Sequence, residues 1–370
     1  MFHRFFRSAP VLLALVFGPA STLESHAADI PDNKPAIVLS ALRSGHQRPL
    51  IAVLAHPRGT EAIQLLVPYG ILSRSGQADV EVVSSTKGPL PLRPALTLGS
   101  ETTLDTFDQQ HGEGADIVVV PESSGEGDSD AACESWLQEQ AHKGALMVSI
   151  SEGVQNLAHA GLLEGHRALG HWSTLAQRQE QWPATQWVTG LRYVQDGNVV
   201  STAGAASAVP VSLALVEAIA GHEKAVALAA DLGVTEWSPQ HETQIFQRSA
   251  TYLFGAWSGL LSRHETVAYT VDDGVDEIAL GLALEPWSHT HRTKIAVQTD
   301  KPAVRSRSGL MLEAAGQKDL HYDHISSLAA GPSAHQLKQT LDDIGARYGP
   351  RSLQVIGAEL EMDLSRTDIN

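Results

Sequence analysis

The fold is decided by residues 145–172, which read ALMVSISEGVQNLAHAGLLEGHRALGHW. The first six residues form a short apolar run typical of a buried strand, and residues 154–161 have helical spacing. Between them, small residues at Ser149 and Gly153 flank Ser151. This pattern predicts a nucleophile elbow, a tight turn from strand to helix that presents the side chain of Ser151. Ser151 is therefore expected at the C-terminal edge of a sheet, pointing toward the N-terminus of the helix.

Similar units extend on both sides of this stretch. Apolar or alternating runs predict strands, helical spacing predicts helices between them, and an Asp-Gly pair at residues 196–197 predicts a hairpin turn. Alternating strands and helices predict a doubly wound, mostly parallel α/β sheet. The predicted strands are 49–54, 79–84, 116–121 and 145–150, the hairpin is 192–201, and the predicted helices are 59–72, 130–143, 154–161 and 209–220.

Two runs carry a family resemblance. The segments AGLLEG, RAL and HW within residues 160–172, and RYVQDGNVVSTAG at 192–204, resemble the DJ-1/PfpI family of the class I glutamine amidotransferase-like superfamily. The similarity is nearest to the branch of isonitrile hydratases and sensor domains of AraC-type regulators. It covers about 175 residues and implies a flavodoxin-like domain at residues 49–222 that is frequently a homodimer.

The resemblance also implies site residues. Ser151 stands where the family has its reactive cysteine, and Glu61 stands where the family has the acid that hydrogen-bonds that cysteine. His171 matches the histidine of the family's His-Trp pair. These three residues are the candidate catalytic groups.

The sequence departs from the family pattern around the same turn. A serine hydroxyl needs a base to act as a nucleophile, whereas a thiol is nucleophilic on its own. Glu122 and Ser123 replace the glycines of a Pro-Gly-Gly run, Glu152 follows the elbow serine, and Gln64 replaces the usual acid. The candidate binding residues are Gly153, Glu152, Glu122 and Ser123.

Two functions remain open. The first is non-catalytic binding of an unknown small ligand or partner at a degenerate elbow, with Ser151 acting as a helix cap. The second is a divergent serine hydrolase or amidotransferase-like enzyme, in which Glu61 or His171 removes the proton of Ser151. An enzyme requires a base within hydrogen-bond reach of the Ser151 hydroxyl. If the site only binds a ligand, we expect Glu122 or Glu152 to fill the space next to that hydroxyl. Neither of these two functions requires a cofactor.

The second half of the chain contains a partial internal repeat. GTEAIQ at 59–64 and GVDEIA at 274–279 each follow an apolar strand and open a helix. We therefore predict a helical connector at 223–265 and a partial second copy at 266–365 that lacks the elbow, with a helix at 333–348 and a strand at 353–361. Two unrelated α/β pieces are the alternative.

The terminal segments and the overall composition limit the location and the partners that we expect for this protein. Residues 1–27 read as an export signal, with an apolar run at 9–20 too short to span a membrane, and residues 28–48 read as a linker. We therefore expect a periplasmic or secreted protein. A net charge of −16 without a basic run argues against nucleic acid, and a single cysteine, Cys133, excludes an internal disulfide. The histidine pairs at 289/291 and 321/324 match no recognised zinc pattern, so no metal is expected.

Overall fold

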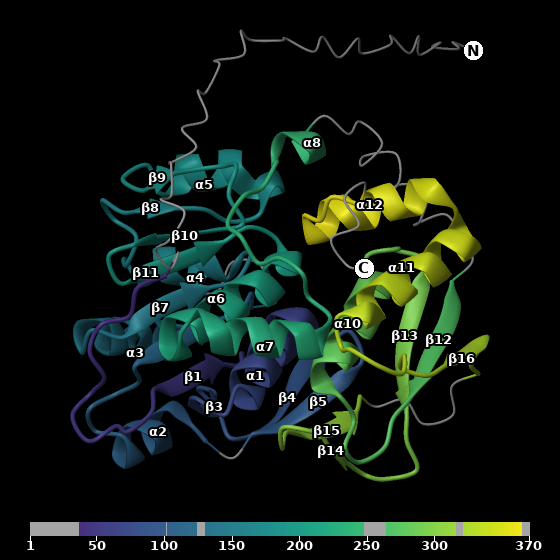
Figure 1. The fold of residues 1–370 in the computed structure, drawn as a ribbon, viewed down its shortest axis with the longest axis horizontal. Coiled ribbons are helices and arrows are strands. Elements are labelled where there is room, and N and C mark those ends of the chain that lie inside the picture. Colours follow the sequence, from purple (N-terminus) through teal and green to yellow (C-terminus); the bar gives the residue numbers. More distant parts are fainter. Residues whose placement is uncertain (1–36, 101, 124–129, 248–263, 316–320, 365–370) are drawn as a thin grey trace, which may run out of the picture.

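The computed structural model describes residues 37–100, 102–123, 130–247, 264–315 and 321–364 (Figure 1). The predicted export signal, most of the predicted linker and residues 248–263 of the predicted connector lie outside these residues.

The core of the first region is a six-stranded sheet in which five strands are parallel. Its order is β10-β11-β7-β6-β1-β3, and only the edge strand β10 runs antiparallel to its neighbour. The predicted strands and hairpin are confirmed to within one or two residues. The strands are β1 (Leu50–Leu54), β3 (Asp79–Val83), β6 (Ile117–Val120), β7 (Leu146–Ser149), β10 (Tyr193–Asp196) and β11 (Val199–Thr202).

Helices cover both faces of this sheet. Successive side chains of β1 point to opposite faces, so Ile51 and Val53 belong to one buried core, and Leu50, Ala52 and Leu54 belong to the other. On the first face lie α1 (Ala62–Arg74), α6 (Ala208–Ala220) and α7 (His222–Leu232), and on the second lie α2 (Leu104–Gln110), α3 (Ala131–His142) and α4 (Gly153–His159).

Smaller elements complete the first region. The strand pair β4 (Gly88–Arg93) and β5 (Leu96–Ser100) forms an antiparallel hairpin that the sequence reading missed, and β2 (Thr60–Glu61) pairs with β4 just before α1. The others are β8 (Arg167–Ala168), η1 (Trp172–Thr174), α5 (Leu175–Gln181), β9 (Gln186–Trp187), η2 (Ala205–Ser207) and α8 (Gln244–Gln247).

An additional α/β region follows residue 263. Its parallel sheet has the order β13-β12-β16, the same relative order as β3-β1-β6. A parallel bridge from Val275 to Ser306 also lies just before its first helix, as the β2–β4 pairing does before α1. The elements are β12 (Glu265–Thr270), α10 (Glu277–Ser288), β13 (Thr293–Gln298), β14 (Val304–Arg305), β15 (Met311–Ala314), β16 (His324–Ser326), α11 (His335–Tyr348) and α12 (Pro350–Leu360).

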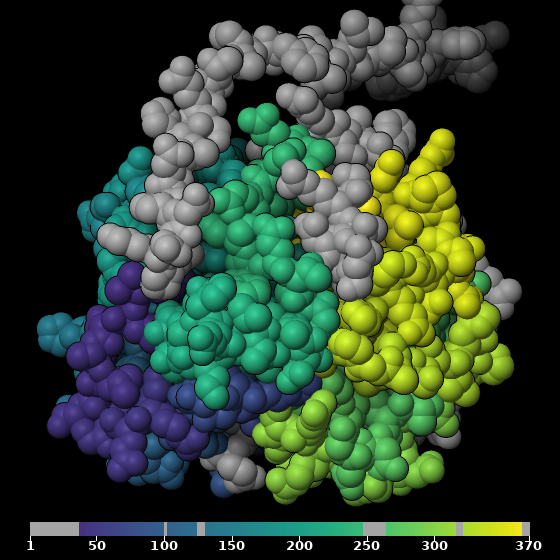
Figure 2. All heavy atoms as spheres, viewed as in Figure 1, coloured from purple at the N-terminus to yellow at the C-terminus, as the bar shows by residue number. Residues whose placement is uncertain are grey.

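The two regions are packed tightly together, and Figure 2 shows them side by side along the molecule. Helix α1 crosses α10 so closely that a Cβ at Gly70 would lie 2.5 Å from Cγ1 of Ile278, and one at Gly281 would lie 3.4 Å from Cβ of Leu66. Strand β15 extends the first region's hairpin by pairing with β5. Arg74 of α1 donates two hydrogen bonds to the Asp276 carboxylate at the start of α10, which anchors the crossing.

One predicted element is wrong. The segment expected as a strand at 353–361 is helix α12. Pro350 occupies the first turn of this helix, where its missing N–H costs no hydrogen bond, and Gly349 ends the preceding helix. The apolar residues in this segment are typical of a buried strand, but the structure buries Val355, Ile356, Ala358 and Leu360 on a helix. The predicted helix at 333–348 is confirmed as α11.

Candidate functional site

The strand–turn–helix unit at Ser151 has the predicted elbow geometry. Ser151 has φ of 51°, a left-handed conformation that is uncommon for a residue other than glycine, and α4 begins two residues later. A Cβ at Gly153 would lie 2.1 Å from the carbonyl oxygen of Val120, so only glycine permits this approach. The Ser151 N–H donates to Oγ1 of Thr202 over 3.0 Å, which fixes the turn against β11. The Ser151 residue is only 4% exposed.

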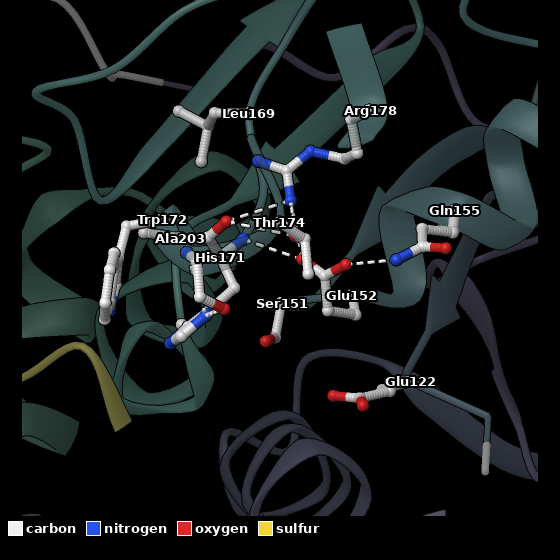
Figure 3. A network of polar contacts seen from close by, with 12 residues as sticks. Glu122, Ser151, Glu152, Gln155, Leu169, His171, Trp172, Thr174, Arg178 and Ala203 are labelled. Atoms are coloured by element: carbon white, nitrogen blue, oxygen red, sulfur yellow. Dashed lines mark hydrogen bonds and ion pairs between the residues drawn. The ribbon is translucent and has the colours of Figure 1, made fainter. Parts of the chain in front are cut away.

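The Ser151 hydroxyl is not paired with a base among the residues drawn in Figure 3, where no dashed line reaches it. His171 uses both of its ring nitrogens elsewhere. Its Nδ1 lies 2.7 Å from Oγ of Ser173, and its Nε2 lies 3.1 Å from the carbonyl oxygen of Ala358 in α12. A carbonyl only accepts, so Nε2 carries the proton and Nδ1 accepts. The expected base role for His171 therefore has no support in this geometry, and the ring links the elbow region to α12.

Glu152 is directed away from the elbow. Its Oε1 accepts hydrogen bonds from Nη1 of Arg178 at 2.7 Å and from the N–H of His171 at 3.0 Å, and its Oε2 accepts from Gln155 (Figure 3). The Arg178 side chain is 1% exposed and the Glu152 side chain is 12% exposed, so the cation is buried and the carboxylate is partly buried. The negative charge that the sequence placed beside the elbow is thus offset by a cation that no motif identified.

Glu122 lies at the same sheet edge as the elbow, because it follows β6, which pairs with β7 up to Val120 and Ser149. In Figure 3 its side chain extends toward the side of the site on which Ser151 lies. Gln64 holds it in two places: Oε1 of Gln64 accepts from the Glu122 N–H at 2.8 Å, and Nε2 donates to Oε2 of Glu122 at 3.1 Å. Burial raises the pKa of Glu122 from its ordinary 4.5 to about 7, with further contributions from the charges of Glu61, Glu152 and Glu285. Glu122 therefore exchanges its proton near neutral pH.

Glu61 lies in the same acidic group. Burial, followed by the charge of Glu285, raises the pKa of Glu61, although Arg93 opposes the shift through hydrogen bonds of 3.0 Å to its Oε1. Glu285 comes from α10 of the additional region, and its Oε2 accepts from the Ile63 N–H at 2.6 Å, at the start of α1. The additional region thus contributes a carboxylate directly beside the candidate site.

His289 lies one helical turn beyond Glu285. Its Nε2 is 3.9 Å from Oε1 of Glu285 and makes no hydrogen bond. Burial lowers the pKa of His289, but the carboxylates of Glu285, Glu359 and Glu61 together raise it above its ordinary 6.5. The acidic group therefore has a titratable cation near it as well as Arg93.

Comparison with known proteins agrees with this geometry. The family model described as "DJ-1/PfpI family" matches residues 50–218. Those residues are a DJ-1/PfpI family domain.

Curated relatives are distant. The chain is 26% identical to the HTH-type transcriptional regulator CdhR of Pseudomonas aeruginosa over 171 residues, which is 46% of this chain and 49% of the regulator. It is also 26% identical to the isonitrile hydratase of Pseudomonas putida over 179 residues, 47% of this chain and 74% of the hydratase. The chain therefore spans about half the length of the first relative and about three quarters of the second.

Among solved structures, Drosophila melanogaster DJ-1beta is 23% identical, with a TM-score of 0.44 over 51% of this chain and all of that chain. A ThiJ/PfpI family protein from Pseudomonas syringae is 22% identical, with a TM-score of 0.44 over 55% of this chain and 81% of the other.

The remaining candidates in and around the DJ-1/PfpI domain have structural contacts. The Ser123 hydroxyl donates to Oδ1 of Asn156 over 3.2 Å, at the rim of α4. Cys133 is buried in α3, and burial, with Asp130, raises the pKa of its thiol to about 12, so it does not replace the missing elbow thiol.

Metal and membrane sites were also sought. In the part of the chain that the structure describes, no three His, Cys, Asp or Glu side chains are grouped to hold a metal ion. Within the same residues, no helix is both long and apolar enough to cross a membrane.

Glu361 is a further polar contact that the sequence did not reveal. It follows α12 with φ of 55°, and its Oε2 accepts from the N–H of Gly204 at 2.9 Å and the N–H of Trp172 at 3.2 Å. Its Oε1 lies 3.2 Å from Nε2 of His241. The carboxylate thus fixes the end of the additional region to the loop that follows β11.

Proposed function

We propose that this is an exported, non-catalytic DJ-1/PfpI-like protein that binds a small ligand at the elbow. One observation carries this proposal: in Figure 3 no interaction joins the Ser151 hydroxyl to a base, and Glu122, whose pKa is raised to about 7, lies at the same sheet edge as the elbow. Acyl transfer at a serine needs a base for the hydroxyl and donors for the developing oxyanion. A carboxylate in that space opposes the oxyanion and instead suits a ligand with hydrogen-bond donors.

The charges around the elbow narrow the ligand class. Glu285 raises the pKa of Glu61, and Glu61 and Glu285 both raise the pKa of Glu122, so their negative charges repel one another, although Arg93 and His289 offset part of this repulsion at Glu61. A small amine would relieve this repulsion, whereas a carboxylic acid would increase it. We therefore expect small primary amines to be preferred over acids of the same size.

A titration tests this preference. Ethylamine and acetate are compared by calorimetry at pH 8, where Glu122 is ionised, against the wild type and Glu122→Gln. Glu113→Gln removes an exposed carboxylate elsewhere and serves as the control. Binding of ethylamine that weakens in Glu122→Gln but not in Glu113→Gln supports the proposal, and equal binding of both probes contradicts it.

A serine enzyme is the second candidate, favoured by the strained left-handed conformation of Ser151. Here Glu122, with a pKa of about 7, would be the group available to take the proton. Labelling with a small fluorophosphonate distinguishes the two functions. Labelling that disappears in Ser151→Ala supports the enzyme, whereas labelling that persists in Ser151→Ala, or is absent from both proteins, supports the binding protein.

We further propose that the region after residue 263 is a degenerate second copy of the domain. The shared strand order, the matching bridge before the first helix, and the pairing of α1 with α10 and β5 with β15 support this. A homodimer, periplasmic or secreted location and the export signal remain predictions from the sequence. Sedimentation velocity tests whether the protein is a homodimer. Fusion of residues 1–27 to a reporter that is active only after export tests the export signal and the location.

A further inference from the structure

A cavity lies between the two regions, apart from the elbow. It has a volume of about 100 Å³ and is lined by α6, the segment 233–242, α10, α11 and the residues that follow α12. Neither Ser151 nor any carboxylate of the acidic group beside it lines this cavity. Such a space is large enough for several water molecules or for part of a small organic molecule.

The inner wall of the cavity is apolar. Val209 and Pro210 of α6, Leu282 of α10 and Leu337 of α11 line it, and all but Val209 are buried. An apolar wall binds water poorly and gains free energy when an aliphatic or aromatic group covers it. These helices come from both regions, so their packing shapes the cavity.

The rest of the lining combines uncharged residues with six ionisable ones, of which four are acidic. Glu236, Glu242, Glu361 and Asp363 contribute four carboxylates, against the guanidinium of Arg192. His241 also lines the cavity, but its Nε2 faces Oε1 of Glu361. The net negative field favours a cation at the charged part of the cavity and disfavours an anion.

We propose that this junction cavity binds an amphipathic organic amine. Its alkyl or aryl body lies against the apolar wall formed by α6, α10 and α11, and its ammonium group lies among the carboxylates of Glu236, Glu242 and Asp363. Ligand pockets in proteins combine these features, an apolar body with a few convergent polar groups, and they lie preferentially where domains meet.

Three probes of equal length test the two halves of the proposal. Hexylamine, hexanol and hexanoate are titrated into the full chain by calorimetry at neutral pH. We expect hexylamine to bind about tenfold or more tightly than hexanoate, with hexanol between them. Propylamine, which has the charge but a shorter body, is expected to bind about tenfold more weakly than hexylamine.

Variants locate the binding site. Val209→Trp, at a half-buried lining position, fills the cavity and should abolish hexylamine binding. The double variant Glu236→Gln/Glu242→Gln changes two exposed rim residues and should weaken hexylamine about tenfold while leaving hexanol unchanged. Glu223→Gln, an exposed residue of α7 outside the cavity, is the matched control and should bind like the wild type. Circular dichroism confirms that each variant is folded.

The proposal is overturned if hexanoate binds as tightly as hexylamine, or if hexylamine does not bind at millimolar concentration. Hexylamine binding that survives in folded Val209→Trp also overturns it. Hexylamine binding that is lost in Glu122→Gln but retained in Val209→Trp would place the amine at the elbow and contradict the junction cavity.

Discussion

Replacing Glu122 by glutamine tests the electrostatics of the elbow directly. Glutamine has nearly the shape of a protonated glutamate, and its side-chain oxygen can still accept the hydrogen bond from Nε2 of Gln64. The bond from the Glu122 backbone to Gln64 is unaffected because it uses the main chain. The substitution therefore removes the ionisation and little else.

The size and sign of the effect follow from the pKa of Glu122. Its pKa rises from 4.5 to about 7 in the folded protein, so the folded state keeps this proton after the unfolded state has lost it. The free energy of unfolding of the wild type consequently falls as the pH rises from about 4.5 to about 7, by up to about 3 kcal/mol from this group alone. Glutamine cannot ionise, so the free energy of unfolding of the variant does not fall with pH because of this group.

Urea unfolding at a series of pH values measures the difference between the two proteins. We expect Glu122→Gln to match the wild type near pH 4 and to be more stable by about 2–3 kcal/mol at pH 8, with the change falling between pH 4.5 and 7. Glu113→Gln, which removes an exposed carboxylate, controls for net charge and should follow the wild type. A variant that is less stable than the wild type at pH 8, or a difference that does not vary with pH, would refute the reasoning.

Three other substitutions probe contacts that the structure makes tight. Arg178→Met leaves the Glu152 carboxylate without its buried cation and should cost about 3 kcal/mol at pH 7; a cost below 1 kcal/mol in urea unfolding would contradict the buried pair. Gly281→Leu forces a side chain against Leu66 where α10 crosses α1, and it should lower the free energy of unfolding by about 2 kcal/mol. Because the two regions pack together there, wild type and variant should each unfold in a single transition. Two separate unfolding transitions in the wild type would show that the regions are not coupled. Gly204→Ala puts a Cβ 2.6 Å or less from α12 and the residue after it, so hydrogen exchange in α12 should accelerate at least about tenfold, and unchanged protection would contradict the contact.

Most of the DJ-1/PfpI domain could be predicted because its strands are buried on both faces. Short β-branched apolar runs such as residues 117–120, alternating with helical segments along the chain, are typical of strands in the middle of a parallel sheet. The β4–β5 hairpin was missed because three prolines and a glycine in residues 88–94 weaken the strand pattern. The helix at Pro350–Leu360 was misread because a short apolar run does not distinguish a buried helix from a strand by itself.

The elbow could also be predicted, whereas its partners could not. Ser151 and Gly153 carry their geometry in the local sequence, since a tight turn demands small residues. Glu285 reaches the start of α1 across 222 positions, and Arg178 reaches Glu152 through a helix that no motif marked. Contacts of that kind depend on how the two regions pack, which a single sequence does not specify.

The departures from the family pattern take on a different meaning once these partners are known. As sequence, glutamate at 122 and glutamine at 64 are two separate losses, but in the structure each amide atom of the Gln64 side chain bonds Glu122, so the two changes form one unit. The same holds for Glu152, whose charge is met by Arg178. A site that had only decayed would leave buried charges without partners, because such groups cost several kcal/mol when unpaired and nothing would select their compensation. The pairing therefore supports the proposal that the site is rebuilt for a different ligand.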